Sequence, residues 1–350
     1  MSRSVPRTSQ RKAEHLRINL EEDVGSGLEA GFDQWRFTPR ALPELDLAAV
    51  SVETDLFDRA LQAPVLISCM TGGTPEAGAI NESLARVAQS RGLALGLGSG
   101  RVLLEDPATR PTFDVRGLAP DVPLLANLGA VQLLRGVSPD ECRRLVAMLR
   151  ADALALHLNA LQEALQPGGD ATFAGMLTAI EQLCSVAEFP VVVKEVGWGI
   201  PPDDVGRLLQ CGVHTIDVAG AGGTSWSEVE RHRSGGRSAA VATAFRDWGL
   251  PTTEAIRRAR VAAPTARLIA SGGLRNGVDA AKAIALGADI VGFAGLFLRA
   301  AAVGVDRALE LADEVTDGLR IAMFCTGSAS LQALRSIDRL ERVEGGRPAT

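Results

Sequence analysis

The sequence predicts an α/β protein built as a (β/α)8 TIM barrel, and three observations lead to this fold class. Short apolar runs recur along the chain, most of the gaps between them show helix-like patterning, and each run ends in polar residues or glycines. Strands that are apolar along their whole length are typical of parallel sheets, which are buried on both faces. A doubly wound open sheet is the alternative, but it would need fewer strands and would usually carry its phosphate loop after the first one.

The predicted elements alternate along one large domain, for which 350 residues are enough. Two predicted helices begin with start signals, Ser138-Pro139-Asp140-Glu141 and Pro251-Thr252-Thr253-Glu254. Eight strands alternating with helices indicate the barrel. The predicted strands are residues 64–69, 93–97, 124–127, 153–158, 190–195, 214–218, 267–270 and 289–293. The predicted helices are residues 77–91, 139–150, 171–187, 203–211, 252–262 and 277–286, and helical patterning continues from 297 to about 341.

The N-terminal segment and the insert after the sixth strand do not follow this alternation of strands and helices. The first ten residues or so are polar and are expected to be disordered, and a charged, helical-looking piece follows at 11–16. Residues 219 to about 250 form a long Gly/Ser/Arg-rich insert after the sixth strand, and such loops are usually functional. We therefore expect three parts: an N-terminal extension at 1–62, the barrel with C-terminal helices at 63–341, and a polar tail at 342–350.

Composition excludes several classes of partner. The net charge of −6 gives no global field to attract nucleic acid or an anionic membrane, so an anionic ligand must be held by local cations. Five cysteines without a CxxC pair indicate reduced thiols in a cytoplasmic protein. The first ten residues contain no apolar run, so no signal peptide is expected. The most apolar segment, 284–305, is interrupted by Asp289 and Arg299, so no bilayer span is expected either.

Four polar residues gather at the end of the fourth predicted strand. His157 and Asn159 point to the same side of the strand, and Gln162 and Glu163 follow in the loop beyond it. The carboxyl ends of parallel strands are where such folds perform chemistry. These groups suit a polar, anionic ligand, with the Glu163 carboxylate able to hold a divalent cation. The alternative is that these side chains only form hydrogen bonds with neighbouring backbone groups. That alternative would be favoured for one such residue but is less favoured for four together.

Glycine-rich turns follow the seventh and eighth predicted strands, where barrels usually bind phosphate. Ser271-Gly272-Gly273 would let backbone N–H groups approach a phosphate, and Arg275 could add charge. Residues 292–295 would close the other side. A tight turn that needs positive φ is the alternative explanation of each glycine pair, but two such turns together favour phosphate.

Lys194 ends the otherwise buried run 191–193, so it needs an anionic or electron-rich partner, or a lowered pKa. Beside a flavin ring it would stabilise the anionic reduced form. An ion pair with Glu195 or Asp217 is the alternative. Glu195 is the poorer partner because successive strand residues face opposite ways.

A series of motifs then resembles a known family. RKAEH, MTGG, GSGR, ANLG, HLNALQE, VVVKEVGWG, DVAGAGGTSW, DWGLPT, SGGLRNG and AIALGADIVGFA occur in this order. Together they resemble type 2 isopentenyl-diphosphate isomerase, the FMN-dependent form, from about residue 11 to 330. RKxEH, HLNxLQE and GGTSW are specific to that family, whereas SGGLRNG and LGAD are shared more widely among FMN-binding barrels.

The resemblance implies a (β/α)8 barrel that interconverts isopentenyl diphosphate and dimethylallyl diphosphate. It implies reduced FMN, a divalent metal, usually Mg2+, and NADPH or another reductant, without net redox change, in a homo-oligomer (tetramer or octamer). The implied catalytic residues are Gln162, His157 and Lys194, and the implied metal ligand is Glu163. The implied substrate-binding residues are Arg11, Lys12, His15, Ser99, Arg101, His157, Asn159 and Gln162. The implied FMN-binding residues are Met70, Thr71, Gly72, Ser99, Asn127, Lys194, Thr224, Gly272, Gly273, Arg275, Ala294 and Gly295.

The implied reaction needs one group that donates a proton and one group that accepts a proton. Moving a double bond means protonating one carbon and deprotonating another, and no side chain at these strand ends is an obvious strong acid. We therefore expect flavin N5 and its neighbours to transfer the proton, with Gln162 orienting the alkene or relaying a proton. One departure is Gly100, where the family usually has Gln. That amide could contact substrate, so its absence could alter affinity or substrate preference.

Three other functions remain open at this stage. An FMN-dependent α-hydroxy-acid oxidase or dehydrogenase would share the SGGxRxG and LGAD elements, and His232, Arg233 and Arg237 could imitate its His–Arg pair. It would leave the N-terminal cluster and HLNALQE without a role. A barrel with a catalytic cysteine on the sixth loop, as in inosine-monophosphate dehydrogenase, is disfavoured because that loop carries Thr224-Ser225-Trp226. A catalytically inactive flavin- or diphosphate-binding regulatory protein is hinted at only by Gly100.

Overall fold

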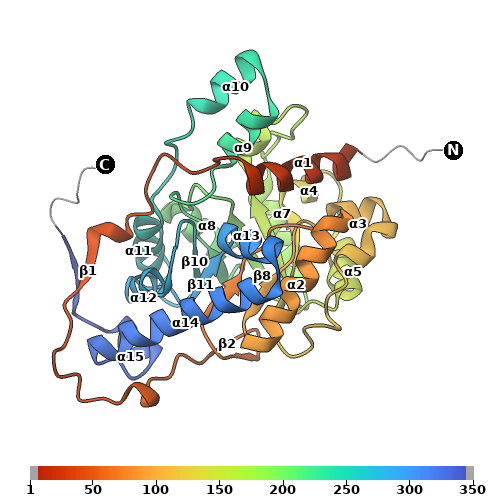
Figure 1. The fold of residues 1–350 in the computed structure, drawn as a ribbon. Helices are drawn as coiled ribbons and strands as arrows, with labels where there is room; N and C mark the ends of the chain where they lie inside the picture. Colours follow the sequence, from red (N-terminus) through yellow and green to blue (C-terminus); the bar gives the residue numbers. More distant parts are fainter. Residues whose placement is uncertain (1–6, 344–350) are drawn as a thin grey trace.

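The computed structural model describes residues 7–343 and contains a closed barrel of eight parallel strands, which confirms the predicted fold class (Figure 1). The strands follow one another around the barrel in chain order, and the last, β11, closes on the first, β4. All eight predicted strands are present, with bounds that differ from the expected ones by at most two residues. They are β4 (Val65–Ile67), β5 (Ala94–Gly96), β6 (Leu124–Gly129), β7 (Ala153–Leu158), β8 (Val191–Glu195), β9 (Thr215–Asp217), β10 (Arg267–Ser271) and β11 (Ile290–Phe293).

Helices cover the outside of the barrel. The Ser138 signal is a capping box: Ser138 Oγ accepts from the Glu141 N–H, and the Glu141 carboxylate accepts from the Ser138 N–H. The outer helices are α2 (Pro75–Arg91), α5 (Pro139–Leu149), α7 (Met176–Val186), α8 (Pro202–Gln210), α11 (Thr252–Ala262), α12 (Gly277–Ala285) and α14 (Val305–Thr326). Shorter helices are α3 (Arg101–Glu105), α4 (Val131–Leu134), α6 (Ala160–Leu165), α13 (Gly295–Val303) and α15 (Leu331–Arg335).

Strand alternation divides the core into two layers. On β7, Leu154 and Leu156 pack among the outer helices, whereas Ala153 and Ala155 face the barrel interior. Leu56 and Leu61 join this inner cluster from the hairpin of β2 (Thr54–Leu56) and β3 (Arg59–Leu61). The hairpin therefore fills the amino-terminal end of the barrel with apolar side chains, and the polar residues lie toward the carboxyl ends of the strands.

The two ends of the chain meet in a small sheet. In the N-terminal extension, β1 (Trp35–Phe37) pairs antiparallel with β12 (Leu340–Arg342). The prediction of helix to about 341 is therefore wrong at its end: Gly327 ends α14 in a left-handed conformation, and after α15 the chain extends to pair with β1. Two short 3-10 turns, Phe32–Gln34 and Leu47–Ala49, flank β1, and a third occupies Pro107–Thr112.

The N-terminal helix and the insert also differ from expectation. Helix α1 spans Arg7–Glu21, so helical structure begins within the stretch predicted to be disordered. Residues 1–6 and 344–350, which include most of that stretch and of the predicted polar tail, lie outside the described residues. The insert after β9 contains two helices, α9 (Trp226–Arg233) and α10 (Gly236–Thr243); α9 packs against α1, and α10 projects from the barrel (Figure 1). Across residues 7–343, no helix is both long and apolar enough to cross a membrane.

Candidate active site

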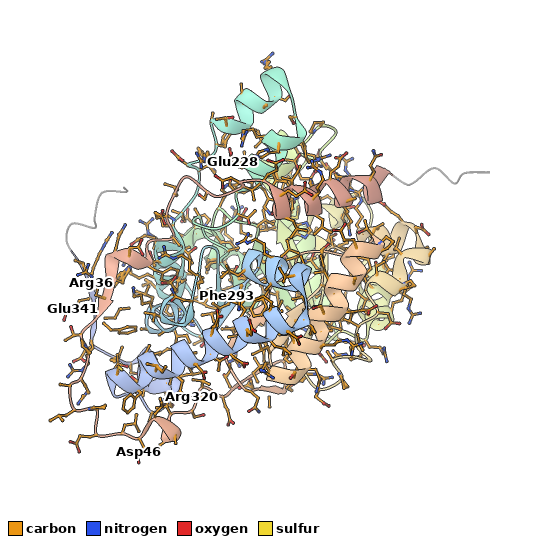
Figure 2. The ribbon with its side chains drawn as sticks, in the orientation of Figure 1. Arg36, Asp46, Glu228, Phe293, Arg320 and Glu341 are labelled. Atoms are coloured by element: carbon orange, nitrogen blue, oxygen red, sulfur yellow. The ribbon has the colours of Figure 1, made fainter. Side chains whose placement is uncertain are left out.

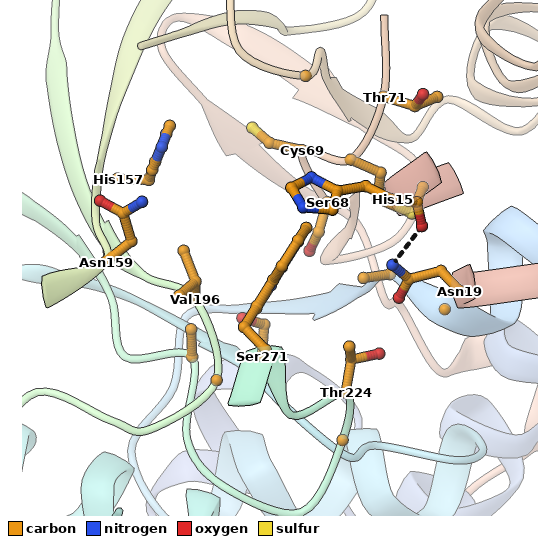
Figure 3. Close-up of a pocket in the computed structure, with 18 of the residues that line it drawn as sticks. His15, Asn19, Ser68, Cys69, Thr71, His157, Asn159, Val196, Thr224 and Ser271 are labelled. Carbon is orange, nitrogen blue, oxygen red and sulfur yellow. Dashed lines mark hydrogen bonds between the residues drawn. The ribbon is translucent and has the colours of Figure 1, made fainter. Parts of the chain in front are cut away.

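A cavity of about 480 Å³ opens at the carboxyl ends of the barrel strands, under α1. Its size lies in the range of small-molecule sites, about 300–1,000 Å³. Every residue that the resemblance assigns to catalysis, substrate, FMN or metal contributes to its lining. Figure 3 shows side chains from distant parts of the chain around this space, with His157 and Asn159 on one side and Asn19 and Thr224 on the other. The individual roles of these residues stay predictions.

Three polar residues from neighbouring strands lie in register, and two of them, His157 and Lys194, line the cavity. His157 on β7 is level with Lys194 on β8, which is level with Asp217 on β9. Lys194 Nζ donates to the carbonyl of Glu195 at 2.6 Å, and Lys194 forms no direct ion pair within residues 7–343. Asp217 Oδ1 accepts from Ser271 Oγ at 2.7 Å, while its Oδ2 is buried without a partner. The ammonium of Lys194 is therefore available to an anionic or electron-rich ligand.

His157 is neutral. Burial, followed by the charges of Lys194 and Lys12, lowers the pKa of His157 to about 3. Its Nδ1 lies 2.9 Å from Asn127 Oδ1, so Nδ1 carries the proton and Nε2 is left as an acceptor. As placed here, His157 can accept a hydrogen bond from a ligand but adds no positive charge for a diphosphate.

The fourth strand end holds the predicted metal ligand. Asn159 Nδ2 donates to Gln162 Oε1 at 3.1 Å and to Glu163 Oε1 at 3.0 Å, and Glu163 Oε2 accepts from the Asp170 N–H at 2.7 Å. Asn159 Oδ1 is buried without a partner. Within the part of the chain that the structure describes, no group of three His, Cys, Asp or Glu residues could hold a metal alone. One carboxylate beside amide oxygens suits Mg2+ that takes its other ligands from substrate phosphates and water.

Lys12 connects α1 to the first two strand ends. Its Nζ donates to the carbonyls of Gly72 at 3.0 Å and Ser99 at 2.6 Å, and lies 5.1 Å from the centre of the Phe113 ring. Burial, followed by the charge of Arg11, lowers the pKa of Lys12 to about 7. Arg11 and Lys12 thus bring cations to the same side of the cavity as Ser99.

Glu230 on α9 lies outside the cavity lining but holds two residues that line it, and the sequence reasoning missed it. Its buried carboxylate accepts from His15 Nε2 at 3.0 Å, from Gln162 Nε2 at 3.3 Å and from Arg233 Nη1 at 2.7 Å. Burial raises the pKa of Glu230, but the hydrogen bond and charge of His15 and the charge of Arg233 outweigh it and hold the pKa below its usual value. The four-residue spacing from Trp226, whose ring meets His15 edge-on, could have indicated a common helical face.

The glycine turns after β9 and β10 pack so closely that side chains are excluded. Gly272 and Gly273 have φ of 103° and 76°; a Cβ on Gly272 would lie 2.0 Å from the Gly220 carbonyl oxygen, and one on Gly273 would lie 2.4 Å from that of Gly222. Thr252 Oγ1 donates to the Gly272 carbonyl at 2.5 Å and holds the turn. This side-chain-free backbone fits the phosphate end of FMN, whose ring would then extend toward Lys194.

Arg275 lies at the edge of this turn, and two carboxylates already form ion pairs with its guanidinium. Its Nη2 donates to Asp33 Oδ1 at 2.6 Å, and its Nε donates to Asp279 Oδ2 at 3.3 Å. These two bonds connect the N-terminal extension to α12.

The residues proposed for an oxidase-like pair lie elsewhere. Arg233 is bound by Glu14 and Glu230, and His232 contacts Arg231 and the carbonyl of Asp23. Neither these two nor Arg237 line the cavity. At Gly100, a Cβ would lie 2.6 Å from Leu145 Cδ1, so Leu145 occupies the space into which a side chain there would begin.

Comparison with known proteins decides the family. The model of the FMN-dependent dehydrogenase family matches residues 142–339, more than half of the chain. A protein of Xanthobacter autotrophicus named isopentenyl-diphosphate delta-isomerase is 52% identical over 94% of this chain and 96% of its own. Proteins of the same name from Nostoc sp. and Rickettsia bellii are 48% and 46% identical, over 96% and 94% of this chain and 97% and 96% of their own. The chain belongs to the isopentenyl-diphosphate delta-isomerases.

Solved structures extend the comparison to the fold. Mandelate oxidase in complex with (S)-2-phenylpropionate matches this isopentenyl-diphosphate delta-isomerase family member with a TM-score of 0.65 over 96% of both chains, at 21% identity. A mutant of mandelate oxidase with benzaldehyde gives the same TM-score of 0.65 over 96% of both chains, at 22% identity. At this identity the likeness concerns the barrel architecture alone. The FMN-dependent family match supports FMN as the cofactor of the cavity.

Proposed function

We propose that this chain interconverts isopentenyl diphosphate and dimethylallyl diphosphate at reduced FMN, by adding one proton to the five-carbon chain and removing another. The observation that supports the proposal is that one cavity is lined by two groups of residues that suit anions. Glycine turns and Lys194 lie at one side, and Glu163 with Arg11 and Lys12 lies at the other. The first suits a flavin phosphate and ring, and the second suits a metal-bound diphosphate.

The chain's own residues would bind and orient the substrate. Glu163 would hold Mg2+ on the diphosphate, and Arg11 and Lys12 would add charge-assisted hydrogen bonds. Asn159 would lie beside the same group, and its Oδ1, which has no protein partner, would accept a hydrogen bond from water held on the Mg2+. Gln162 would face the alkene, with its amide held by Asn159 and Glu230.

Reduced FMN, when bound, supplies an electron-rich ring that can give and take a proton next to the alkene. Lys194 would hold a positive charge beside the ring, and Asn127 would link its binding to His157. Met70, Thr71 and Thr224 would contact the rest of the cofactor from the first and sixth strand ends.

The remaining requirements are also proposals. NADPH or another reductant would reduce FMN once, without being consumed in each turnover. We propose a cytoplasmic homo-oligomer, tetramer or octamer. All five cysteines are free, which supports a reducing compartment. Sedimentation of the purified protein would measure the oligomeric state.

An anaerobic NMR assay tests the activity. Purified protein with isopentenyl diphosphate, FMN, NADPH and Mg2+ should produce dimethylallyl diphosphate, and omission of FMN, reductant or metal should each abolish turnover. Glu163→Gln should weaken the response to Mg2+, and Gln162→Ala should lower kcat. Steady oxidation of lactate or glycolate without isomerisation would support the hydroxy-acid oxidase instead and overturn the proposal.

A further inference from the structure

Asn81 is a buried amide on α2 that bonds to two segments at the edge of the cavity. It is 2% exposed, and its Nδ2 donates to the Thr71 carbonyl at 3.2 Å and to the Thr112 carbonyl at 2.9 Å. Helix α2 packs against α14 and against the turn Pro107–Thr112 on the outside of the barrel (Figure 2). Asn81 therefore connects the outer helical layer to the loop that follows β4.

A glycine lets α2 approach this turn closely. Gly78 lies three residues before Asn81 and so on the same face of the helix. A Cβ on Gly78 would lie 3.2 Å from Thr112 Cα. Thr112 Oγ1 in turn accepts from the Gly73 N–H at 2.8 Å. The helix, the turn and the loop after β4 are thus joined by hydrogen bonds around Asn81.

The Thr71 carbonyl adds a third segment. It also accepts from the Gly98 N–H at 2.9 Å, which joins the loop after β5 to the loop after β4. An amide NH2 group has two N–H donors, and Asn81 uses them on two different segments. We call these hydrogen-bonded residues, Asn81, Thr71, Gly73, Gly98 and Thr112, the Asn81 cluster.

The groups that enclose the Lys12 ammonium are direct chain neighbours of this cluster. Lys12 Nζ donates to the Gly72 and Ser99 carbonyls and lies over the Phe113 ring, and we call these three groups the Lys12 enclosure. The cluster residues next to them in the chain are, in the same order, Thr71 with Gly73, Gly98, and Thr112. An ammonium has three N–H donors, so one remains for a ligand in the cavity that Lys12 lines.

We propose that Asn81 is a positioning residue for the substrate: it holds three segments together and so fixes the enclosure from which Lys12 reaches the diphosphate. This inference rests on the proposed diphosphate site. It adds that the placement of Lys12 depends on a side chain that does not itself line the cavity. Loss of the Asn81 amide would let the segments separate and let water reach the ammonium.

The charge state of Lys12 reports whether the enclosure is intact. Burial, followed by the charge of Arg11, lowers the pKa of Lys12 to about 7, and the charge of Glu105 opposes this shift. His157 also lies within reach of the Lys12 charge, and it is neutral. Exchange of Asn81 for another neutral residue leaves these groups in place. It would therefore change the pKa of Lys12 through hydration of the ammonium, which favours the charged form.

NMR titration of the ligand-free, full-length chain tests the assignment. The chain has three lysines, Lys12, Lys194 and Lys282, so isotopic labelling of lysine Cε gives three signals, and Lys12→Arg assigns one of them. Asn81→Ala should raise the pKa of Lys12 by roughly one unit or more, because water then solvates the ammonium. Thr112→Val, which keeps the shape of the side chain but removes the hydroxyl from the cluster, should shift the pKa in the same direction.

Gln89→Ala is the matched control, because it removes another amide of α2 that bonds elsewhere. Gln89 Nε2 donates to Asp121 Oδ2 at 2.8 Å, and its Oε1 accepts from the Asp121 N–H at 3.1 Å. This variant should leave the pKa of Lys12 unchanged. A pKa that stays unchanged in both Asn81→Ala and Thr112→Val, or that rises equally in Gln89→Ala, would overturn the inference while leaving the proposed function intact.

Calorimetric titration with Mg2+-bound inorganic diphosphate at pH 6.5 tests the connection to the substrate. Lys12 is largely charged at this pH in the wild type and in the variants, so a difference in affinity reports its placement. Asn81→Ala should weaken binding roughly three- to tenfold, and Gln89→Ala should not. Equal affinity in Asn81→Ala and the wild type would overturn the substrate role of Asn81. A wild-type chain that binds no diphosphate would overturn the proposed function, while the NMR titration would still decide whether Asn81 holds the Lys12 enclosure.

Discussion

Lys12 shows how a single residue couples the site to pH. Its ammonium is enclosed by two backbone carbonyls and the Phe113 ring, and burial lowers its pKa to about 7. A diphosphate beside Lys12 favours the charged form and so raises this pKa. Binding therefore requires proton uptake above about pH 7, and affinity falls as pH rises through and beyond that value.

We predict that substitution of Lys12 by a permanent cation removes this dependence. Mg2+-bound inorganic diphosphate is titrated calorimetrically at pH 6.5 and 8.5 into the wild type and Lys12→Arg. The ratio of wild-type to variant affinity should fall by up to about tenfold per pH unit above 7, because Lys12 alone loses its charge. Since diphosphate titrates equally with both proteins, the ratio cancels its own ionisation. An equal ratio at both pH values would contradict the prediction.

Single residues also show where sequence reasoning succeeds. The cavity-lining residues named from motifs lie at strand ends, whose positions follow from the barrel once the apolar runs are recognised. Glu230 was missed because its bond to Gln162 forms only when α9 packs against α6 and α1. The bonding of Arg275 was missed because Asp33 is distant in the chain and reaches it only through the tertiary fold.

At the scale of elements, the crossing of α12 and α14 depends on two glycines. A Cβ on Gly277 would lie 2.3 Å from the Val315 carbonyl oxygen and 2.4 Å from the Leu319 nitrogen, and Gly318 faces Gly277 across the contact. Backbone therefore packs on backbone, and α14 lies close over the helix that follows the phosphate turn.

We predict that Gly277→Ala separates these helices and lowers the free energy of unfolding by about 2 kcal/mol, as overpacked cores do. Gly206→Ala on α8 is the matched control, because a Cβ there meets nothing within 4 Å. It should stabilise the protein by about 0.5–1 kcal/mol through its better helix propensity. Urea unfolding of both variants checks the pair, and a loss of stability in Gly206→Ala equal to that in Gly277→Ala would contradict the packing explanation.

The bounds of helices and strands show which elements the sequence pattern predicts and which depend on tertiary contacts. The helices with start signals are found within one residue of expectation, since caps and periodicity are local. The sequence predicts a long loop for the insert because its glycines, serines and arginines carry little apolar periodicity. Helix α9 nevertheless forms there, since Val229 and Glu230 are buried against its neighbours. Strand β12 exists only because β1 lies beside it.

At the scale of the whole molecule, the barrel has one apolar end and one polar end. The β2–β3 hairpin contributes Leu56 and Leu61, each 1% exposed, to the inner cluster, so the barrel is sealed below the cavity. The amino-terminal end of the barrel therefore contributes to folding stability, and the carboxyl-terminal end carries the binding cavity, as is usual in this architecture.

We predict that Leu61→Ala separates these two properties. Loss of the buried side chain should lower the free energy of unfolding by about 2–4 kcal/mol, because a cavity remains at the barrel end. FMN affinity should stay within about twofold of the wild type, since the hairpin lies at the opposite end from the cavity lining. Denaturant unfolding and flavin titration measure the two effects, and a large loss of FMN affinity in the folded variant would show that the ends are coupled.

The proton transfer at a reduced flavin is tested most directly by anaerobic NMR in D2O. The wild type is supplied with isopentenyl diphosphate, Mg2+, FMN and just enough reductant to bleach the flavin. The account predicts that the double bond moves, that deuterium enters the five-carbon chain as it moves, and that the flavin stays reduced over many turnovers. A substrate that remains unchanged, or a flavin that is oxidised once for each product formed, would contradict it.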